Sequence, residues 1–165
     1  MPAHPKRRRK ALKPADELET AVRDTAIRLL ARREHSAAEL AAKLKQRGFD
    51  RGLIDAEVTR LTAEGLQDDV RFAEQFTEER VQRGDGPLKI RSALAERGVA
   101  ASVSDAALAP FADRWQELAW DALVRRFGSQ PATERREWAR RMRFLQTRGF
   151  PGEVAWSLLS GEPEQ

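Results

Sequence analysis

Arginine is the residue type in this 165-residue sequence that is best suited to forming a binding site. Between residues 125 and 148, eight arginines accompany two acidic residues, so this segment carries a net charge of +6. A planar guanidinium can donate two parallel hydrogen bonds to a carboxylate or to a phosphate. The segment is therefore predicted to bind either an acidic protein surface or nucleic acid, and both alternatives remain open.

Part of this segment is predicted to be an amphipathic helix with a basic outer face. At about 100° per residue, its apolar side chains gather on one side and three arginines on roughly the opposite side. The apolar residues are Trp138, Met142 and Leu145. The arginines, here called the outward stripe, are Arg136, Arg140 and Arg143. We predict that the outward stripe contacts a partner, with Arg135 and Arg148 beside it.

Basic residues also occur in two earlier segments that resemble this one in sequence. These residues are Lys43, Arg47, Lys89 and Arg97. A single charged side chain on a helix is usually a solvated surface residue. We therefore predict these four as partner contacts of second priority, behind the outward stripe. Together with the five arginines above, they form the complete set of candidate binding residues.

The sequence lacks the residues that most enzymes and metal sites require. It contains no cysteine, and its two histidines are His4 and His35, so neither a histidine pair for a metal nor a convincing general base is in place. Residues 84–87 lack the lysine and the preceding strand of a phosphate-binding loop. Asp68 and Asp69 are better explained as a helix cap, and His35 as a packing residue. We therefore expect no catalysis, no cofactor and no metal.

The elements that carry the basic residues recur along the chain. The stretch from Ser36 to Phe49 has a second copy at 86–99 and a third at 137–150. Each copy contains a glycine that follows an arginine and lies four residues after a leucine. These glycines are Gly48, Gly98 and Gly149. A period of about fifty residues is typical of an array of small structural repeats.

The first copy shows that the recurring pattern describes a helix. Ser36 is predicted as its N-cap, with Glu39 completing a capping box. Leu40 and Leu44 are predicted to form its buried stripe, and Gly48 to end it in the left-handed conformation. Further helix caps are expected at these positions: Asp50, Asp68 or Asp69, Ser102 with Asp105, and Thr133.

We therefore predict an all-α fold, an elongated and curved tandem array of three three-helix repeats. The boundaries are a disordered basic arm at 1–18 and repeats at 19–66, 67–112 and 113–161. The first 13 residues carry six positive charges and no acidic residue. Outside this segment and the basic segment at 125–148, the chain has a net charge of −8. The arm is equally consistent with a phosphate tether and with a solubilising tail.

The tryptophans, including Trp120 and Trp138, are predicted mostly as core residues.

Several short motifs, in order and at the right spacing, closely resemble those of the RecX regulatory proteins. The matching segments are Leu30 to Ser36, Glu39-Leu40, Lys43-Leu44, Arg47 to Phe49, Gly65 to Asp69, Phe72-Ala73, Gly86-Pro87, Ile90, and Leu94 to Gly98. The resemblance covers roughly residues 20–160 and is weakest in the third repeat. At His35 the family more usually has a tyrosine.

The resemblance implies a regulator without catalytic residues. Proteins of this family bind the RecA nucleoprotein filament, limit its growth or promote its loss, and so suppress ATP hydrolysis, strand exchange and co-protease activity. The alternative is a helical module that acts by occupying DNA directly. With neither a signal peptide nor a membrane span in the sequence, the expected compartment is the cytoplasm, and a monomer is the default expectation.

Overall fold

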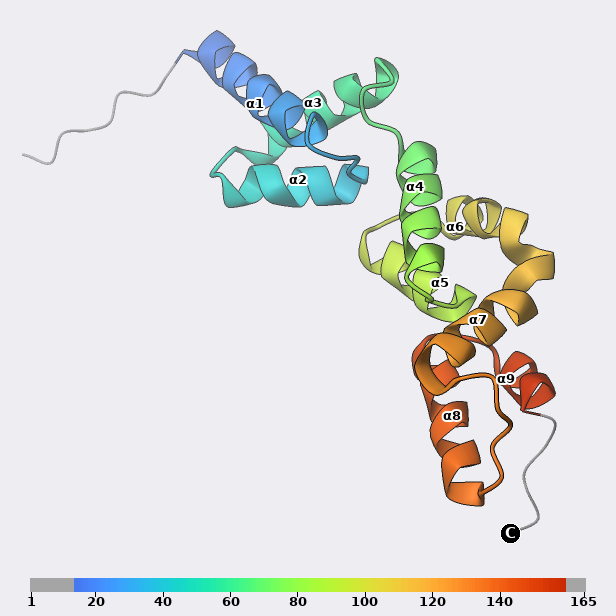
Figure 1. Cartoon of the computed structure of the whole chain (residues 1–165). Coiled ribbons are helices and arrows are strands. Elements are labelled where there is room, and N and C mark those ends of the chain that lie inside the picture. Colours follow the sequence, from blue (N-terminus) through green and yellow to red (C-terminus); the bar gives the residue numbers. More distant parts are fainter. Residues whose placement is uncertain (1–13, 160–165) are drawn as a thin grey trace, which may run out of the picture.

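The described part of the chain is helical and contains no strand. The computed structural model describes residues 14–159, which form three groups of three α-helices (Figure 1). The first repeat contains α1 (Ala15–Leu30), α2 (Ala37–Gln46) and α3 (Arg51–Ala63). The second contains α4 (Asp69–Gln82), α5 (Pro87–Glu96) and α6 (Ala101–Leu108). The third contains α7 (Trp115–Phe127), α8 (Arg135–Thr147) and α9 (Gly152–Leu158), and the 3-10 helix η1 (Ala109–Arg114) precedes it.

Each repeat has its own hydrophobic core. Leu40, Leu44 and Leu61 are fully buried in the first repeat, and each of the other repeats has a separate cluster of buried apolar residues. Trp115 and Leu118 pack against both the second and the third cluster, so α7 joins these two cores. Stability in such an array comes from the repeats and from the contacts between neighbours.

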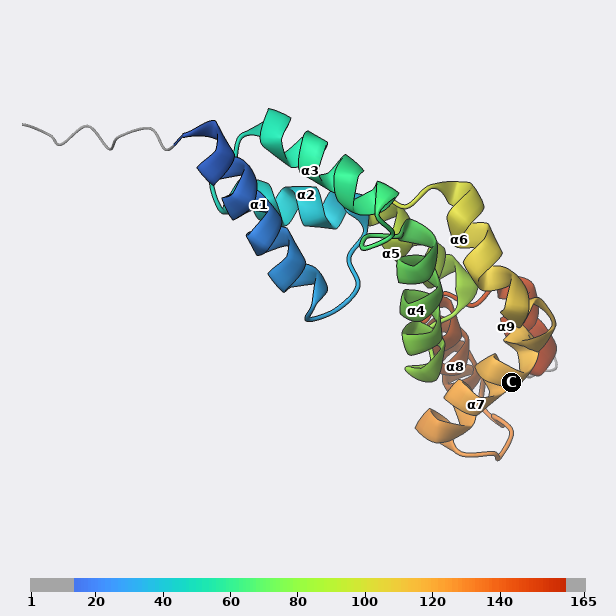
Figure 2. The ribbon, with the colours of Figure 1, turned by 90° about the horizontal axis from the view of Figure 1, so that it is seen from above.

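The repeats follow one another along an elongated, bent molecule. Figure 1 and Figure 2 both place the first repeat at one end and the second in the middle. The predicted all-α array of three-helix repeats is therefore confirmed. None of the helices between residues 14 and 159 combines the length and apolarity that crossing a membrane requires.

Three of the predicted helix caps are present. The Ser36 hydroxyl accepts a hydrogen bond from the Glu39 amide at 3.1 Å, and Asp50 and Asp68 cap α3 and α4 in the same manner. The carboxylate of Glu39 forms ion pairs with Arg33 and Arg97 at 3.2 and 3.4 Å. Glu39 thus contributes to contacts outside its own helix.

Three local predictions were wrong. Ser102 lies inside the first turn of α6, whose N-cap is Ala100, so Ser102 and Asp105 form no cap. The helix α8 begins after Glu134, which has an extended backbone, so Thr133 is one residue too early to cap it. The helix α1 begins at Ala15, within the expected arm, because acidic residues in its first turn favour a helix N-terminus. The rest of the arm, residues 1–13, lies outside the described residues.

Candidate partner-binding surface

The middle helices of neighbouring repeats meet end to start. At the first junction, the Ser36 hydroxyl donates a hydrogen bond to the carbonyl oxygen of Arg97 at 2.6 Å. Nε of Arg97 lies 3.4 Å from Glu39, which belongs to the preceding repeat. Gly98 lies against the start of α2, where an added β-carbon would come within 2.5 Å of Cβ of Ala38. The end of α5 is therefore closely fitted to the start of α2.

Side chains of α4 strengthen the first junction. Asp69 accepts a hydrogen bond from the Ala37 amide at 2.8 Å, so a residue of the second repeat satisfies a free donor at the start of α2. Nε of Arg71 lies 2.5 Å from Glu34, and this hydrogen bond raises the pKa of Arg71. The first two repeats are thus joined by charged contacts on both sides of the loop between α1 and α2.

The second junction repeats this arrangement with different atoms. The Gly86 amide donates to the carbonyl oxygen of Arg148 at 2.6 Å, and the Leu88 amide donates to that of Gly149 at 3.0 Å. Nη1 of Arg148 lies 3.6 Å from Asp85, again a carboxylate of the preceding repeat. An added β-carbon on Gly86 would lie 2.5 Å from the carbonyl carbon of Gly149. The end of α8 is therefore fitted to the start of α5.

Two predicted binding residues, Arg97 and Arg148, hold these junctions together, and a third, Lys89, forms an ion pair within the second repeat. Arg97 pairs with Glu39, and both Arg148 and Lys89 pair with Asp85, whose side chain is 3% exposed. Nζ of Lys89 lies 2.8 Å from Asp85. Because their charges are already matched by carboxylates, Arg97, Arg148 and Lys89 have a structural role that sequence reasoning did not identify.

The outward stripe is exposed as predicted. The residues Arg136, Arg140 and Arg143 are all exposed on α8, and Arg135 is exposed at its start. The guanidinium of Arg140 lies over the ring of Phe127 at 5.1 Å. Among the described residues, no carboxylate lies within 4 Å of the three stripe guanidinium groups. Their charges are therefore free to meet an anionic partner.

Arg141 lies between Arg140 and Arg143 in the sequence but, in contrast to them, its side chain is buried. Its side chain is 4% exposed, and Nη1 donates to the carbonyl oxygen of Gln130 at 2.6 Å. A second nitrogen, Nη2, donates to Glu137. These bonds fasten the loop after α7 to α8, so Arg141 positions the helix that carries the stripe.

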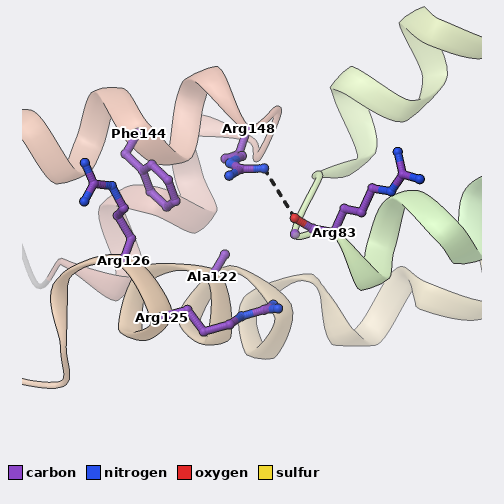
Figure 3. A pocket seen from close by; sticks show the side chains of 7 residues that line it. Arg83, Ala122, Arg125, Arg126, Phe144 and Arg148 are labelled. Carbon is purple, nitrogen blue, oxygen red and sulfur yellow. Dashed lines mark hydrogen bonds between the residues drawn. The ribbon is translucent and has the colours of Figure 1, made fainter.

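A hollow of about 270 Å³ lies where the second and third repeats meet. We call it the arginine hollow, and its lining residues are Arg83, Gly84, Ala122, Arg125, Arg126, Phe144 and Arg148. Figure 3 shows Arg125 and Arg126 on α7 facing Phe144 on α8 and Arg148, the residue that follows this helix. Nη1 of Arg148 donates to the carbonyl oxygen of Arg83 at 3.3 Å, while the side chain of Arg83 extends away from this bond.

The arginine hollow and the outward stripe form one basic surface. Arg136, Arg140, Phe144 and Arg148 are spaced four residues apart along α8, so the row leads from the stripe into the hollow. Among the described residues, Arg83, Arg125 and Arg126 have no carboxylate within 4 Å. A concave surface of one sign of charge attracts anionic partners. Arg125 and Arg126 begin the basic segment of the sequence, whereas Arg83 lines the hollow only because the second repeat packs against the third.

The prediction that most tryptophans are core residues was wrong. Trp138 is buried and Trp115 is half-buried, but Trp120 and Trp156 are 40% and 53% exposed. Trp120 lies one position from the buried Ala119, at the edge of the α7 face that enters the core. Trp156 packs edge to face on Trp138, with ring centroids 5.5 Å apart.

His35 is a buried packing residue, as predicted. It is 2% exposed, its Nδ1 lies 2.9 Å from the carbonyl oxygen of Arg33, and burial lowers the pKa of the ring. Between residues 14 and 159, no three His, Asp or Glu side chains come together in an arrangement that could hold a metal ion.

The two predicted binding residues of the first repeat lie away from both junctions. Lys43 is half-buried on α2, and Arg47 is exposed at the end of this helix. Nη1 of Arg47 donates to the carbonyl oxygen of Lys43 at 3.1 Å. The structure therefore does not bring Lys43 and Arg47 together with the outward stripe.

Three family models match the chain in succession. Residues 23–61, 68–108 and 112–159 match the first, second and third three-helix domains of RecX, respectively. A regulatory protein RecX of Halorhodospira halophila is 47% identical over 133 residues, covering 81% of this chain and 83% of its own. The corresponding protein of Chromohalobacter salexigens is 48% identical, covering 82% of this chain and 88% of its own.

Solved structures share the fold. A crystal structure of a regulatory protein RecX superposes with a TM-score of 0.76 at 23% identity, covering 88% of this chain and 72% of its own. The structure of RecX from Lactobacillus salivarius superposes with a TM-score of 0.74 at 18% identity, covering 88% and 96%, respectively.

Proposed function

Because the chain belongs to the RecX family of regulatory proteins, we propose that it regulates the RecA recombinase by binding the RecA nucleoprotein filament. Binding limits growth of the filament and thereby lowers RecA ATP hydrolysis, strand exchange and co-protease activity. The protein acts as a monomer in the cytoplasm, in DNA recombination and repair and in the SOS response, and it catalyses no reaction itself.

The observation that carries this proposal is the continuous basic surface of the third repeat. The three arginines of the outward stripe, and Arg125 and Arg126 in the arginine hollow, have no described carboxylate within 4 Å. A guanidinium in a polar rim raises the association rate and selects an acidic partner surface. The bent array then spans neighbouring filament subunits, with this surface facing their carboxylates.

A second candidate function is direct occupation of DNA. The same guanidinium groups would neutralise phosphates, and the arginine hollow also contains an aromatic ring, that of Phe144, on which a base could stack. Such binding would weaken steeply with salt, because each neutralised phosphate releases counterions. Filament binding is preferred because the family relatives are named as regulators.

RecA ATP hydrolysis on single-stranded DNA tests the proposal. The purified protein is titrated into a fixed amount of RecA and DNA, and the steady-state hydrolysis rate is followed. We expect the rate to fall with a saturable dependence on the added protein. An unchanged rate at protein concentrations equal to that of RecA would refute the proposed function.

A further inference from the structure

The end of α2 differs from the ends of α5 and α8 in what covers it. Gly98 and Gly149 are pressed against the preceding repeat, whereas a β-carbon added to Gly48 would meet no described atom within 4 Å. All three glycines have positive φ and the same place in the repeat. Figure 1 shows α2 running from the second repeat toward the outer end of the molecule. The docking surface of the first repeat is therefore open where the other two are covered.

The two covered ends define the chemistry that this surface recognises. In both, the carbonyl oxygen of the terminal arginine accepts a hydrogen bond at 2.6 Å from the start of a helix, from Ser36 Oγ in one and from the Gly86 amide in the other. In both, the guanidinium meets a carboxylate from the same helix start, Glu39 for Arg97 and Asp85 for Arg148. A helix end and a helix start attract each other through their free carbonyls and amides.

The open end has the charge that such a contact requires. A hollow of about 150 Å³ beside it is lined by Thr25, Arg28, Leu29, Arg32 and Arg47. Among the described residues, no carboxylate lies within 4 Å of its three guanidinium groups. Arg47, Arg97 and Arg148 occupy the same position of the repeat, immediately before the glycine that ends the middle helix. Arg97 and Arg148 each pair with a carboxylate, whereas Arg47 has no such partner among the described residues.

We propose that the end of α2 binds the start of an acidic helix on a protein partner, in the way that α5 and α8 bind the preceding repeats. The partner helix places a small residue against Gly48 and donates a hydrogen bond to the carbonyl oxygen of Arg47. A carboxylate of the same helix start pairs with the guanidinium of Arg47. The inference rests on the proposed function in one respect, since it assigns the helix to the protein component of the filament.

Other occupants fit this surface less well. The α8 start of a second copy is not an acidic helix start, because Arg135 and Arg136 accompany Glu134 there and Glu137 already pairs with Arg141. Residues 1–13 carry six positive charges and no carboxylate, so their charges would also repel this surface. A DNA phosphate would satisfy the guanidinium groups but would leave the carbonyl oxygen of Arg47 without a donor.

Charge reversal at Arg47 tests the proposal. Arg47→Glu and the neutral variant Arg47→Met are compared with Arg51→Glu, the control, which makes the same charge change at a side chain that is 94% exposed. Affinity is measured at one salt concentration for a pre-formed RecA filament and for bare single-stranded DNA. We expect Arg47→Glu to weaken filament binding about tenfold and Arg47→Met about threefold. Arg51→Glu should bind both targets as the unmodified protein does.

The outcomes separate this proposal from the proposed function. Filament binding that survives both Arg47 variants unchanged would overturn the inference and leave the proposed function standing. Equal losses for the filament and for bare DNA would identify a phosphate contact and overturn the helix-start assignment. A protein that dimerises in sedimentation, and becomes monomeric with Arg47→Glu, would identify a second copy as the occupant. Failure of the unmodified protein to bind the filament would overturn both.

Discussion

The hydroxyl of Ser36 caps α2 and also donates a hydrogen bond to the carbonyl oxygen of Arg97 at 2.6 Å. One side chain thus begins the middle helix of the first repeat and fastens the end of the middle helix of the second. Ser36 is fully buried, so water cannot replace it in either contact. Helix capping and the joining of repeats therefore depend on the same atoms.

Removing this hydroxyl should destabilise the protein more than loss of an ordinary cap. Ser36→Ala is expected to lower the free energy of unfolding by about 2–3 kcal/mol, because it removes a cap and also leaves a carbonyl without its donor. Asp50→Ala, which removes the exposed cap of α3, should cost about 1 kcal/mol. Urea denaturation followed by circular dichroism measures both. Equal losses would show that the bond to Arg97 contributes nothing.

The close approach at Gly98 should make this glycine less replaceable than Gly48. Both have positive φ, 74° and 87°, so alanine at either position costs about 1–2 kcal/mol of backbone strain. At Gly98 the added carbon would also lie 2.5 Å from Cβ of Ala38. Gly98→Ala should therefore lower the free energy of unfolding by at least about 1 kcal/mol more than Gly48→Ala. The same denaturation series checks this, and indistinguishable midpoints would contradict the packing of the first junction.

His35 should make stability depend on pH below neutrality. Burial lowers the pKa of the folded-state ring from its ordinary value, so the unfolded chain takes up a proton first as the pH falls. Stability is full above about pH 6.5 and declines below it, until the folded ring itself becomes protonated. We expect His35→Tyr to remove part of the decline between pH 7.5 and pH 5. An identical decline in the variant would exclude His35 as its source.

Reversing charges in the outward stripe should weaken regulation without unfolding the third repeat. Arg136→Glu with Arg143→Glu leaves Arg140 over Phe127 and is expected to raise the protein concentration for half-inhibition of RecA ATP hydrolysis about tenfold. A control pair, Lys45→Glu with Arg51→Glu, makes the same charge change at exposed positions on α2 and α3 of the first repeat. Helix content from circular dichroism should match in all three proteins. Inhibition equal to that of the control would remove the stripe from the binding surface.

The sequence predicted the features that depend on neighbouring residues. Ser36, Asp50 and Asp68 cap helices through amides two or three residues away, so their roles are visible in the local pattern. The end of α8 was equally visible from Gly149. Trp120 was predicted wrongly because it lies at the edge of the buried face of α7. At such an edge, a small rotation of the helix about its axis decides whether the side chain is buried or exposed.

The candidate site was predicted less completely than the fold. Arg136, Arg140 and Arg143 are exposed as expected, since one helix sets their common face. Arg97 and Arg148 pair with carboxylates across the junctions, and these pairings depend on how one repeat sits on the next. Arg83 reaches the arginine hollow for the same reason. No pattern within a single repeat contains this information.

Binding of the unmodified protein to two targets at the same salt concentration shows whether it recognises the filament or only the DNA. One is a pre-formed RecA filament on single-stranded DNA, and the other is the same DNA without RecA. Fluorescence anisotropy of the labelled protein gives both dissociation constants. We expect at least about tenfold tighter binding to the filament, which corresponds to about 1.4 kcal/mol. Equal affinity for the two targets would contradict this expectation and favour direct occupation of DNA.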